Sequence, residues 1–320
     1  MSNRPGRVFR RIEPDDTAGL AEYIRIRSTV TPENPESADQ VRWEDTAYPG
    51  EATRFLVELG GRAVGAASTG RIWMNRPDYP RYWLGLWVMP DARRQGIGGE
   101  LYRAASEVAR AAGKTGLQTE VSEAHADGVS FLLHRGFTVT GRAKMVRLDL
   151  RAVEPGPINP PAGVRLTTLA ERPDLVAGVH AVAMAAFPDI PTSDEPLEAG
   201  TLEAFIKRDV DRTGVPRDGF MVALDEASGE AVGYASLVFV PGSTTIAYHD
   251  MTAVRPADRG RGIAAALKRA TIAWAVEHRL EWLETGNDEE NAPMRAINRT
   301  LGYQPMPDAL EMQGPLAPDA

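Results

Sequence analysis

One six-residue pattern occurs twice in this chain of 320 residues, and it constrains the fold more than any other feature of the sequence. The pattern Arg-x-x-Gly-x-small begins at Arg93 and again at Arg259, an offset of 259 − 93 = 166 residues. The same offset aligns Val88 with Val254, Pro90 with Pro256, Leu101 with Leu267, Leu117 with Leu283, Thr119 with Thr285 and Gly136 with Gly302. A register kept over this many positions indicates a duplication of one domain-sized unit.

A proline-rich stretch separates the two copies. Residues 151–162 contain four prolines, which favour an extended connector. We therefore predict an N-terminal domain over residues 1–150, a linker over 151–162 and a C-terminal domain over 163–320. The second copy has extra residues early, and the segment 187–200 with its three prolines is the natural place for them.

Both copies show the same succession of hydrophobic patterns. A strand and a helix come first, and a hairpin follows at residues 54–69 and again at 220–238. A further strand (82–88; 248–254) then leads through a glycine-rich turn into a long helix, and another strand and helix come after it. This order predicts an α/β fold made of two tandem domains, each a central mixed β-sheet flanked by helices.

Composition narrows the functional classes. The chain has no cysteine, which excludes disulfides, thiolate nucleophiles and cysteine-ligated metals, and its five histidines lack metal-binding spacing. The formal net charge of −8 disfavours nucleic acid as a partner, and no apolar run is long enough to span a membrane. We expect a cytoplasmic protein without a metal site.

The glycine-rich turn joins a strand to a helix in both copies. The first amides of a helix have no intrahelical acceptors, and glycine lets a phosphate approach them closely. Arg94, Arg259 and Arg261 add charge suited to a diphosphate. Two alternatives stay open: the glycines only start a helix, or Gly260 and Gly262 belong to a dinucleotide fingerprint, although the first copy does not fit that pattern.

The strings Val-Met-Pro-x-x-Arg-x-x-Gly-Ile-Gly from Val88 and Val-Arg-Pro-x-x-Arg-x-x-Gly-Ile-Ala from Val254 resemble the acetyl-CoA motif of the GNAT superfamily of N-acetyltransferases. The tandem layout is similar to the mycothiol synthase type of this superfamily. The resemblance implies acetyl-CoA as the cofactor. It assigns cofactor binding to Val88, Arg94, Gln95, Gly96, Ile97 and Gly98 in the first copy, and to Val254, Arg259, Gly260, Arg261, Gly262, Ile263, Ala264 and Asn291 in the second. Asn291 also suits the N-cap of a helix.

A general base is expected beside the thioester, because an amine must lose a proton before or during its attack. In the second copy one strand face carries Tyr248, Asp250 and Thr252, whereas the positions at the 166 offset are Tyr82, Leu84 and Leu86. Asp250 is our preferred base and Glu284 a second candidate. An equally good reading of Asp250 is a surface carboxylate paired with an arginine. His249 should face away unless the strand has a bulge.

The general acid is harder to place. In the family a tyrosine often protonates the departing thiolate, but its positions here are Leu132 and Asn298. Asn298 can hydrogen-bond a thiolate and cannot protonate it, so the proton would come from water, Tyr248 or Tyr303.

These residues favour an N-acetyltransferase that moves an acetyl group from acetyl-CoA to a primary amine of a small molecule or peptide by direct attack. The second copy is expected to catalyse, and the first to keep cofactor affinity with little activity. The alternative is a non-catalytic acyl-CoA sensor or scaffold. We expect a monomer or homodimer.

Overall fold

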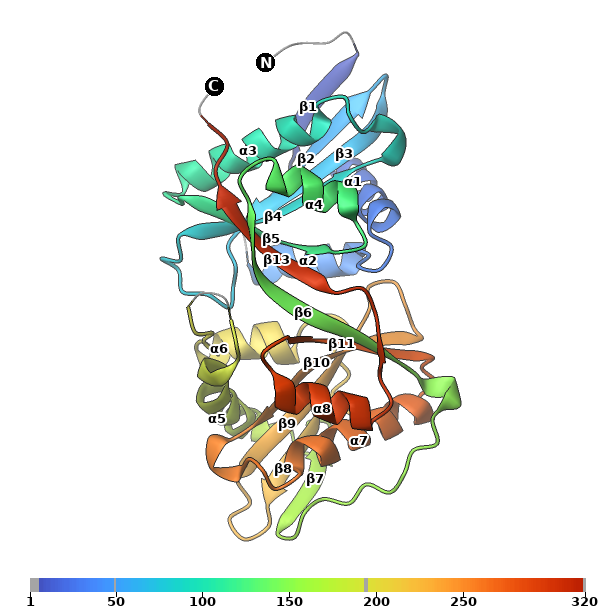
Figure 1. Cartoon of the computed structure of the whole chain (residues 1–320). Helices are drawn as coiled ribbons and strands as arrows, with labels where there is room; N and C mark the ends of the chain where they lie inside the picture. Colours follow the sequence, from blue (N-terminus) through green and yellow to red (C-terminus); the bar gives the residue numbers. More distant parts are fainter. Residues whose placement is uncertain (1–5, 49, 193–194, 319–320) are drawn as a thin grey trace. The chain divides into compact units, whose positions relative to one another are not determined.

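The computed structural model describes residues 6–48, 50–192 and 195–318, and the chain forms two compact units. Unit 1 comprises the chain up to Thr140 together with Leu310 onward, and unit 2 runs from Gly141 to Ala309. Each unit contains a mixed β-sheet with helices packed against it (Figure 1). The predicted α/β fold, present twice, is therefore confirmed.

The sheet of unit 1 has the strand order β1-β2-β3-β4-β5-β13. Strands β1 to β4 pair antiparallel, and β4 pairs parallel with β5. The strands are β1 (Arg7–Ile12), β2 (Ala52–Leu59), β3 (Arg62–Gly70), β4 (Arg81–Val88), β5 (Gly116–Ser122) and β13 (Ala309–Pro315). The helices are α1 (Thr17–Val30), α2 (Ala38–Ala47), α3 (Ile97–Ala111) and α4 (Ala126–Leu133).

The sheet of unit 2 has the order β6-β11-β10-β9-β8-β7, with the short β12 also paired to β6. Here β10 and β11 are the parallel pair. The strands are β6 (Thr138–Asp149), β7 (Val164–Thr168), β8 (Met221–Asp225), β9 (Ala231–Phe239), β10 (Ile246–Val254), β11 (Trp282–Asp288) and β12 (Gln304–Pro305). The helices are α5 (Val176–Ala186), α6 (Leu202–Phe205), α7 (Ile263–Glu277) and α8 (Ala292–Thr300), with a π-helical turn at Ile206–Val210 after α6.

The last strand of each repeat completes the sheet of the other unit. Strand β6 follows α4 along the chain but belongs to unit 2 from residue 141 onward, where it pairs antiparallel with β11. Strand β13 closes the chain and belongs to unit 1 from residue 310 onward. The compact units therefore do not coincide with a division at residues 151–162, and the domains 1–150 and 163–320 stay a prediction about the repeat along the chain.

The packing within unit 2 determines where a site can form. Helices α5 and α7 both pack against β9 and β10, and α7 and α8 lie on the opposite side of the strands from α5 and α6 (Figure 1). The apolar core of this unit contains Leu237, Ala247, Ile263, Leu267 and Leu283. Among the described residues, no helix is both long and apolar enough to cross a bilayer.

Candidate active site

The helices after the two glycine turns begin differently from their neighbours. Helices α1, α2, α6 and α8 each begin with a side chain that accepts a hydrogen bond from a first-turn amide. Helices α3 and α7 begin at Gly96 (φ 86°) and Gly262 (φ 91°), both left-handed and without a side-chain cap. A Cβ on either glycine would meet no atom within 4 Å, so the space in front of these amides is open. Both helix starts therefore suit a diphosphate.

The isoleucine of each motif fixes the helix against the sheet. Ile97 and Ile263 are buried, and both approach a glycine of the neighbouring strand. A Cβ on Gly65 would lie 2.6 Å from the Ile97 Cγ2 atom, and one on Gly233 would lie 3.3 Å from the Ile263 Cγ2 atom. These isoleucines can offer a ligand only their backbone amides, because their side chains belong to the core.

The motif arginines hold the turn together. Arg93 donates from Nε to the Val88 carbonyl (3.2 Å), and Arg259 donates to the Val254 carbonyl (3.1 Å). The Arg259 guanidinium also pairs with Asp189 at 2.7 Å, and that of Arg261 pairs with Asp258 at 2.8 Å. Their charge is thus partly balanced by neighbouring carboxylates. Arg94 occupies the place of Gly260, and both have positive φ (62° and 76°).

A gap opens beside each central strand because its parallel neighbour separates from it. In unit 2, β10 and β11 pair only over Ile246–Tyr248 and Trp282–Glu284. Since the Arg255 amide donates to the Val232 carbonyl on the β9 side, the amide of Val254 points toward the gap. In unit 1 the Met89 amide bonds to Val64, which places the Val88 amide in the same way. Both valines therefore have the orientation expected of a thioester-binding amide.

Only the central strand of unit 2 contains a β-bulge. His249 lies opposite Leu237 and Thr252 lies opposite Ala235, so Asp250 and Met251 share a single partner position on β9. The equivalent pairing of β3 with β4 is unbroken from Trp83 to Val88. The inserted residue changes the repeat offset from 248 − 83 = 165 before the bulge to 254 − 88 = 166 after it. The structural counterpart of His249 is therefore Leu84.

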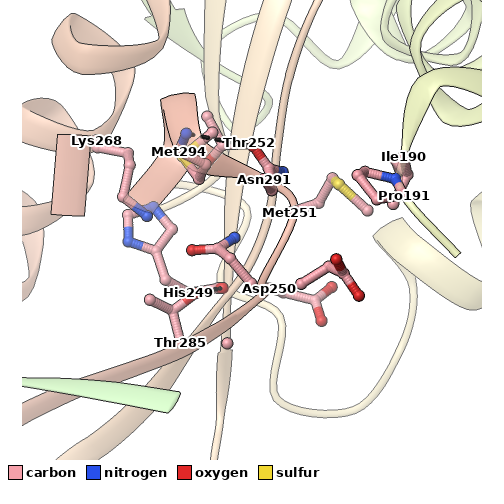
Figure 2. Close-up of a pocket in the computed structure, with 13 residues that line it drawn as sticks. Ile190, Pro191, His249, Asp250, Met251, Thr252, Lys268, Thr285, Asn291 and Met294 are labelled. Atoms are coloured by element: carbon pink, nitrogen blue, oxygen red, sulfur yellow. Dashed lines mark hydrogen bonds between the residues drawn. The ribbon is translucent and has the colours of Figure 1, made fainter. Parts of the chain in front are cut away.

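A pocket of about 170 Å³ lies in unit 2 between the separating strands (Figure 2). It is lined by residues 249–252 of β10 and 285–288 of β11, by Lys268 of α7, by Asn291 and Met294 at the start of α8, and by Ile190 and Pro191. Within the described ranges, no group of three or more His, Asp or Glu side chains is placed to hold a metal ion.

His249 is part of a buried hydrogen-bond network. Its Nε2 atom lies 3.0 Å from the Thr271 hydroxyl, and its Nδ1 atom lies 3.2 Å from the Tyr303 hydroxyl. Thr271 donates its proton to the Lys268 carbonyl (2.9 Å), so Nε2–H donates to Thr271 and Tyr303 donates to Nδ1. Burial, and then the charge of Lys268, hold the pKa of His249 well below its usual value. The ring is therefore neutral at pH 7.

Lys268 is the most unusual group in the pocket wall. The residue is 2% exposed, and burial lowers its pKa to about 7. Its amino nitrogen lies 5.5 Å from the centre of the Tyr303 ring. Burial likewise raises the pKa of Tyr303 above its normal value. Figure 2 shows Lys268 and His249 next to each other at one side of the pocket.

Asp250 lines the pocket and lies in a second polar cluster. Its Oδ1 atom is 3.7 Å from Arg212 Nη1, and its side chain is 26% exposed. Burial raises the pKa of Asp209, on the π-helical turn, to about 6, and the nearby charge of Asp250 contributes to this increase. Burial and the charges of Asp209 and Asp250 raise the pKa of Tyr234, whose hydroxyl has no hydrogen-bond partner among the described residues.

The other predicted catalytic residues lie outside the pocket lining. Glu284 is buried and accepts hydrogen bonds from Arg147, at 2.8 Å from its Nε atom. The Tyr248 hydroxyl lies 3.6 Å from the Met145 sulfur. Asn298 donates to Asn287 Oδ1 (2.6 Å), and its own Oδ1 is buried without a partner among the described residues. Asn291 caps α8 by accepting from the Met294 amide (3.3 Å) and also lines the pocket.

Unit 1 has apolar packing where unit 2 has its polar network. The counterparts of His249, Lys268, Thr271, Asn298 and Tyr303 are, in order, Leu84, Tyr102, Ala105, Leu132 and Phe137, which belong to one apolar cluster. The Phe131 ring also covers Gly98, where a Cβ would lie 2.8 Å from the ring. The gap beside β4 is therefore lined by hydrocarbon rather than by groups that transfer protons.

Sequence reasoning missed Lys268 and Thr271 and did not give His249 a role. The signal for the first two was present, because the 166 offset pairs Lys268 with Tyr102 and Thr271 with Ala105, on helix faces that should be apolar. The signal for His249 was hidden, because the bulge shifts its partner from Trp83 to Leu84.

Comparisons with known proteins bear on this geometry. The model of the acetyltransferase (GNAT) family matches residues 20–137 and 181–303. A mycothiol acetyltransferase of Mycobacterium sp. (strain JLS) is 38% identical over 100 residues, which are 31% of this chain and 31% of that protein. One from Mycolicibacterium vanbaalenii is 31% identical over 182 residues, 57% of this chain and 56% of that protein. The matches thus span about a third to a half of these curated relatives.

Two solved structures share the fold along nearly the whole chain. A tandem GNAT protein from the clavulanic acid biosynthesis pathway has a TM-score of 0.76 at 22% identity, covering 98% of this chain and 100% of that one. A GCN5-related N-acetyltransferase from Sphaerobacter thermophilus has a TM-score of 0.73 at 18% identity, covering 99% and 98%. Because the family model matches both halves and most of the chain, the protein belongs to the GNAT acetyltransferase family, a family of acyltransferases that use acyl-CoA donors.

Proposed function

We propose that the protein transfers an acetyl group from acetyl-CoA to a primary amine by direct attack of the amine on the thioester, and that unit 2 performs the reaction. The pocket between β10 and β11 supports this proposal most strongly, because it joins an uncapped helix start, an inward-pointing strand amide and ionisable side chains in one unit.

Binding of the donor is assigned to backbone groups. The amides of Ile263 and Ala264, behind Gly262, would hold the diphosphate, and the Val254 amide would bind the thioester oxygen. The side chain of Asn291 borders the pocket and can bond to the pantetheine arm. The guanidinium groups of Arg259 and Arg261 flank the diphosphate position, although they also pair with Asp189 and Asp258.

Asp250 is the proposed general base. Among the predicted catalytic residues it is the one that lines the pocket, whereas Glu284 is engaged by Arg147. Its pairing with Arg212 is loose at 3.7 Å, so the carboxylate can accept a proton from an incoming ammonium, directly or through water. Asn298 has a free Oδ1 that can orient the cofactor and cannot supply a proton.

The acceptor is proposed to be a small molecule or peptide that carries a primary amine. The curated relatives are named mycothiol acetyltransferases, so an amine of the class those enzymes acetylate is the first to test. The partial overlap with them leaves other amines, including polyamines and peptide N-termini, as further members of the test panel.

Turnover measured as thiol release from acetyl-CoA, over this panel, tests the proposal. Asp250→Asn should lower kcat by about 10²-fold or more, as for loss of a general base. Gly262→Glu should abolish donor binding by placing a carboxylate before the helix amides, and Gly96→Glu is the matched control in unit 1. Coenzyme binding without thiol release for any amine would favour the acyl-CoA sensor instead. Activity lost in Gly96→Glu and kept in Gly262→Glu would assign catalysis to unit 1.

A further inference from the structure

Lys268 is a buried cation whose charge is not balanced by the described residues. It projects from the second turn of α7 into the pocket wall, and within the described part of the chain its amino group makes no hydrogen bond or ion pair. A buried polar group usually has a partner, because an unpaired ammonium loses its hydration without compensation. A partner supplied by a bound molecule would explain why this residue is here.

The groups around Lys268 cannot supply a counter-charge. From β10 it faces the neutral imidazole of His249, and from the segment after α8 it faces the un-ionised phenol of Tyr303. On its own helix, the Thr271 hydroxyl is used by the Lys268 carbonyl and His249. Burial is the sole cause of its lowered pKa, so the pocket carboxylates Asp250 and Asp288 do not act on it appreciably.

The proposed reaction creates an anion that needs such a partner. When the carbon–sulfur bond of the thioester breaks, its electron pair stays on sulfur. The position where relatives often place a tyrosine to protonate this sulfur holds Asn298, which has no ionisable proton. Asn298 hydrogen-bonds to Asn287, a residue of the same pocket that Lys268 lines.

We propose that the Lys268 ammonium holds the departing thiolate of coenzyme A and protonates it, a role that rests on the proposed function of unit 2. The new nitrogen–carbon bond forms as the carbon–sulfur bond breaks, and one proton moves from Lys268 to sulfur, leaving a thiol and a neutral lysine. Asp250 takes one proton from the amine and releases it to solvent, and Lys268 regains one from solvent, so the protons balance. A thiol has a pKa of about 8.5, so transfer from an ammonium near 7 is favourable.

A thermodynamic cycle tests contact between Lys268 and sulfur. Calorimetry compares the affinity of coenzyme A with that of desulfo-coenzyme A, for the wild-type protein and for Lys268→Met. We expect the thiol to improve binding by about fivefold or more in the wild type, and to have no effect in the variant. Lys268→Gln provides a second uncharged variant in case the first does not fold, and Lys207→Met, which changes an exposed lysine on the π-helical turn, is the control.

Kinetics supply the second readout. The wild-type kcat should fall as pH rises above about 7, where Lys268 loses its proton, and the uncharged variants should lose this limb and be at least about 10²-fold slower. An equal thiol effect in wild type and variants, or an equal loss of affinity for both ligands, would overturn the assignment. Turnover in the wild type together with such a result refutes the role of Lys268 alone, whereas no turnover on any amine refutes the proposed function.

Discussion

Lys268→Met should stabilise unit 2 at neutral pH. The lysine is buried on α7, and its pKa falls from the ordinary 10.5 to about 7 on folding. Lowering a pKa by one corresponds to about 1.4 kcal/mol, so the full cost of burying the ammonium is about 5 kcal/mol. Methionine has a similar length and no charge, and it removes this cost.

The sign of the pH dependence follows from proton binding. The unfolded chain keeps the lysine proton up to a pH of about 10.5, whereas the folded protein keeps it only below about 7. The unfolded state thus binds more protons between these values, and the free energy of unfolding of the wild type rises with pH across this window. From pH 7 to pH 9 we expect a gain of about 2 kcal/mol from this residue, which Lys268→Met should lose.

Urea denaturation at pH 7 and pH 9, followed by circular dichroism and tryptophan fluorescence, measures this gain. Comparing the wild type and the variant at each pH cancels the contribution of the other titrating groups. Lys207→Met removes an exposed lysine and should leave the pH increment unchanged. An increment in Lys268→Met equal to that of the wild type would refute the argument that burial of this ammonium is costly.

Two further predictions concern the same unit. Gly262→Ala should cost about 1–2 kcal/mol, seen as a lower Tm, because alanine is strained at φ 91° although its Cβ would meet no atom; an unchanged Tm would contradict it. Tyr303→Phe should cost about 1–2 kcal/mol, measured by urea unfolding, because it removes the donor to His249 Nδ1. Phe137→Tyr, which adds a hydroxyl inside the apolar cluster of unit 1, should destabilise that unit rather than stabilise it.

The repeat made the fold predictable from sequence. The glycine turn, the long helix and the following strand keep one offset through both copies, and α3 and α7 start at the positions that the offset aligns. Their physical cause is local, because a left-handed glycine at Gly96 or Gly262 ends the turn and an isoleucine after it packs on the sheet. Local causes of this kind can be read from one sequence.

The exchange of β6 and β13 could not be read in that way. Both strands follow a helix and a glycine corner in the sequence, as they would in two separate domains. Which sheet such a strand joins depends on its partners, and β6 pairs with β11 over Asp149 to Ala143, more than 130 residues farther along the chain. A pairing over this distance leaves no periodic signal within the strand itself.

One inserted residue in β10 accounts for both the misaligned positions and the division of labour in the pocket. The bulge lets His249 contact α7, through Thr271, while Asp250 pairs with Arg212 after α6. Helices α6 and α7 lie on opposite sides of the sheet, so Lys268 and Asp250 have different surroundings, and burial alone lowers the pKa of the lysine. An acid and a base that neutralised each other across a small pocket could not serve opposite proton transfers. Because the strand separates them, Asp250 can take a proton from the amine while Lys268 keeps one for the sulfur.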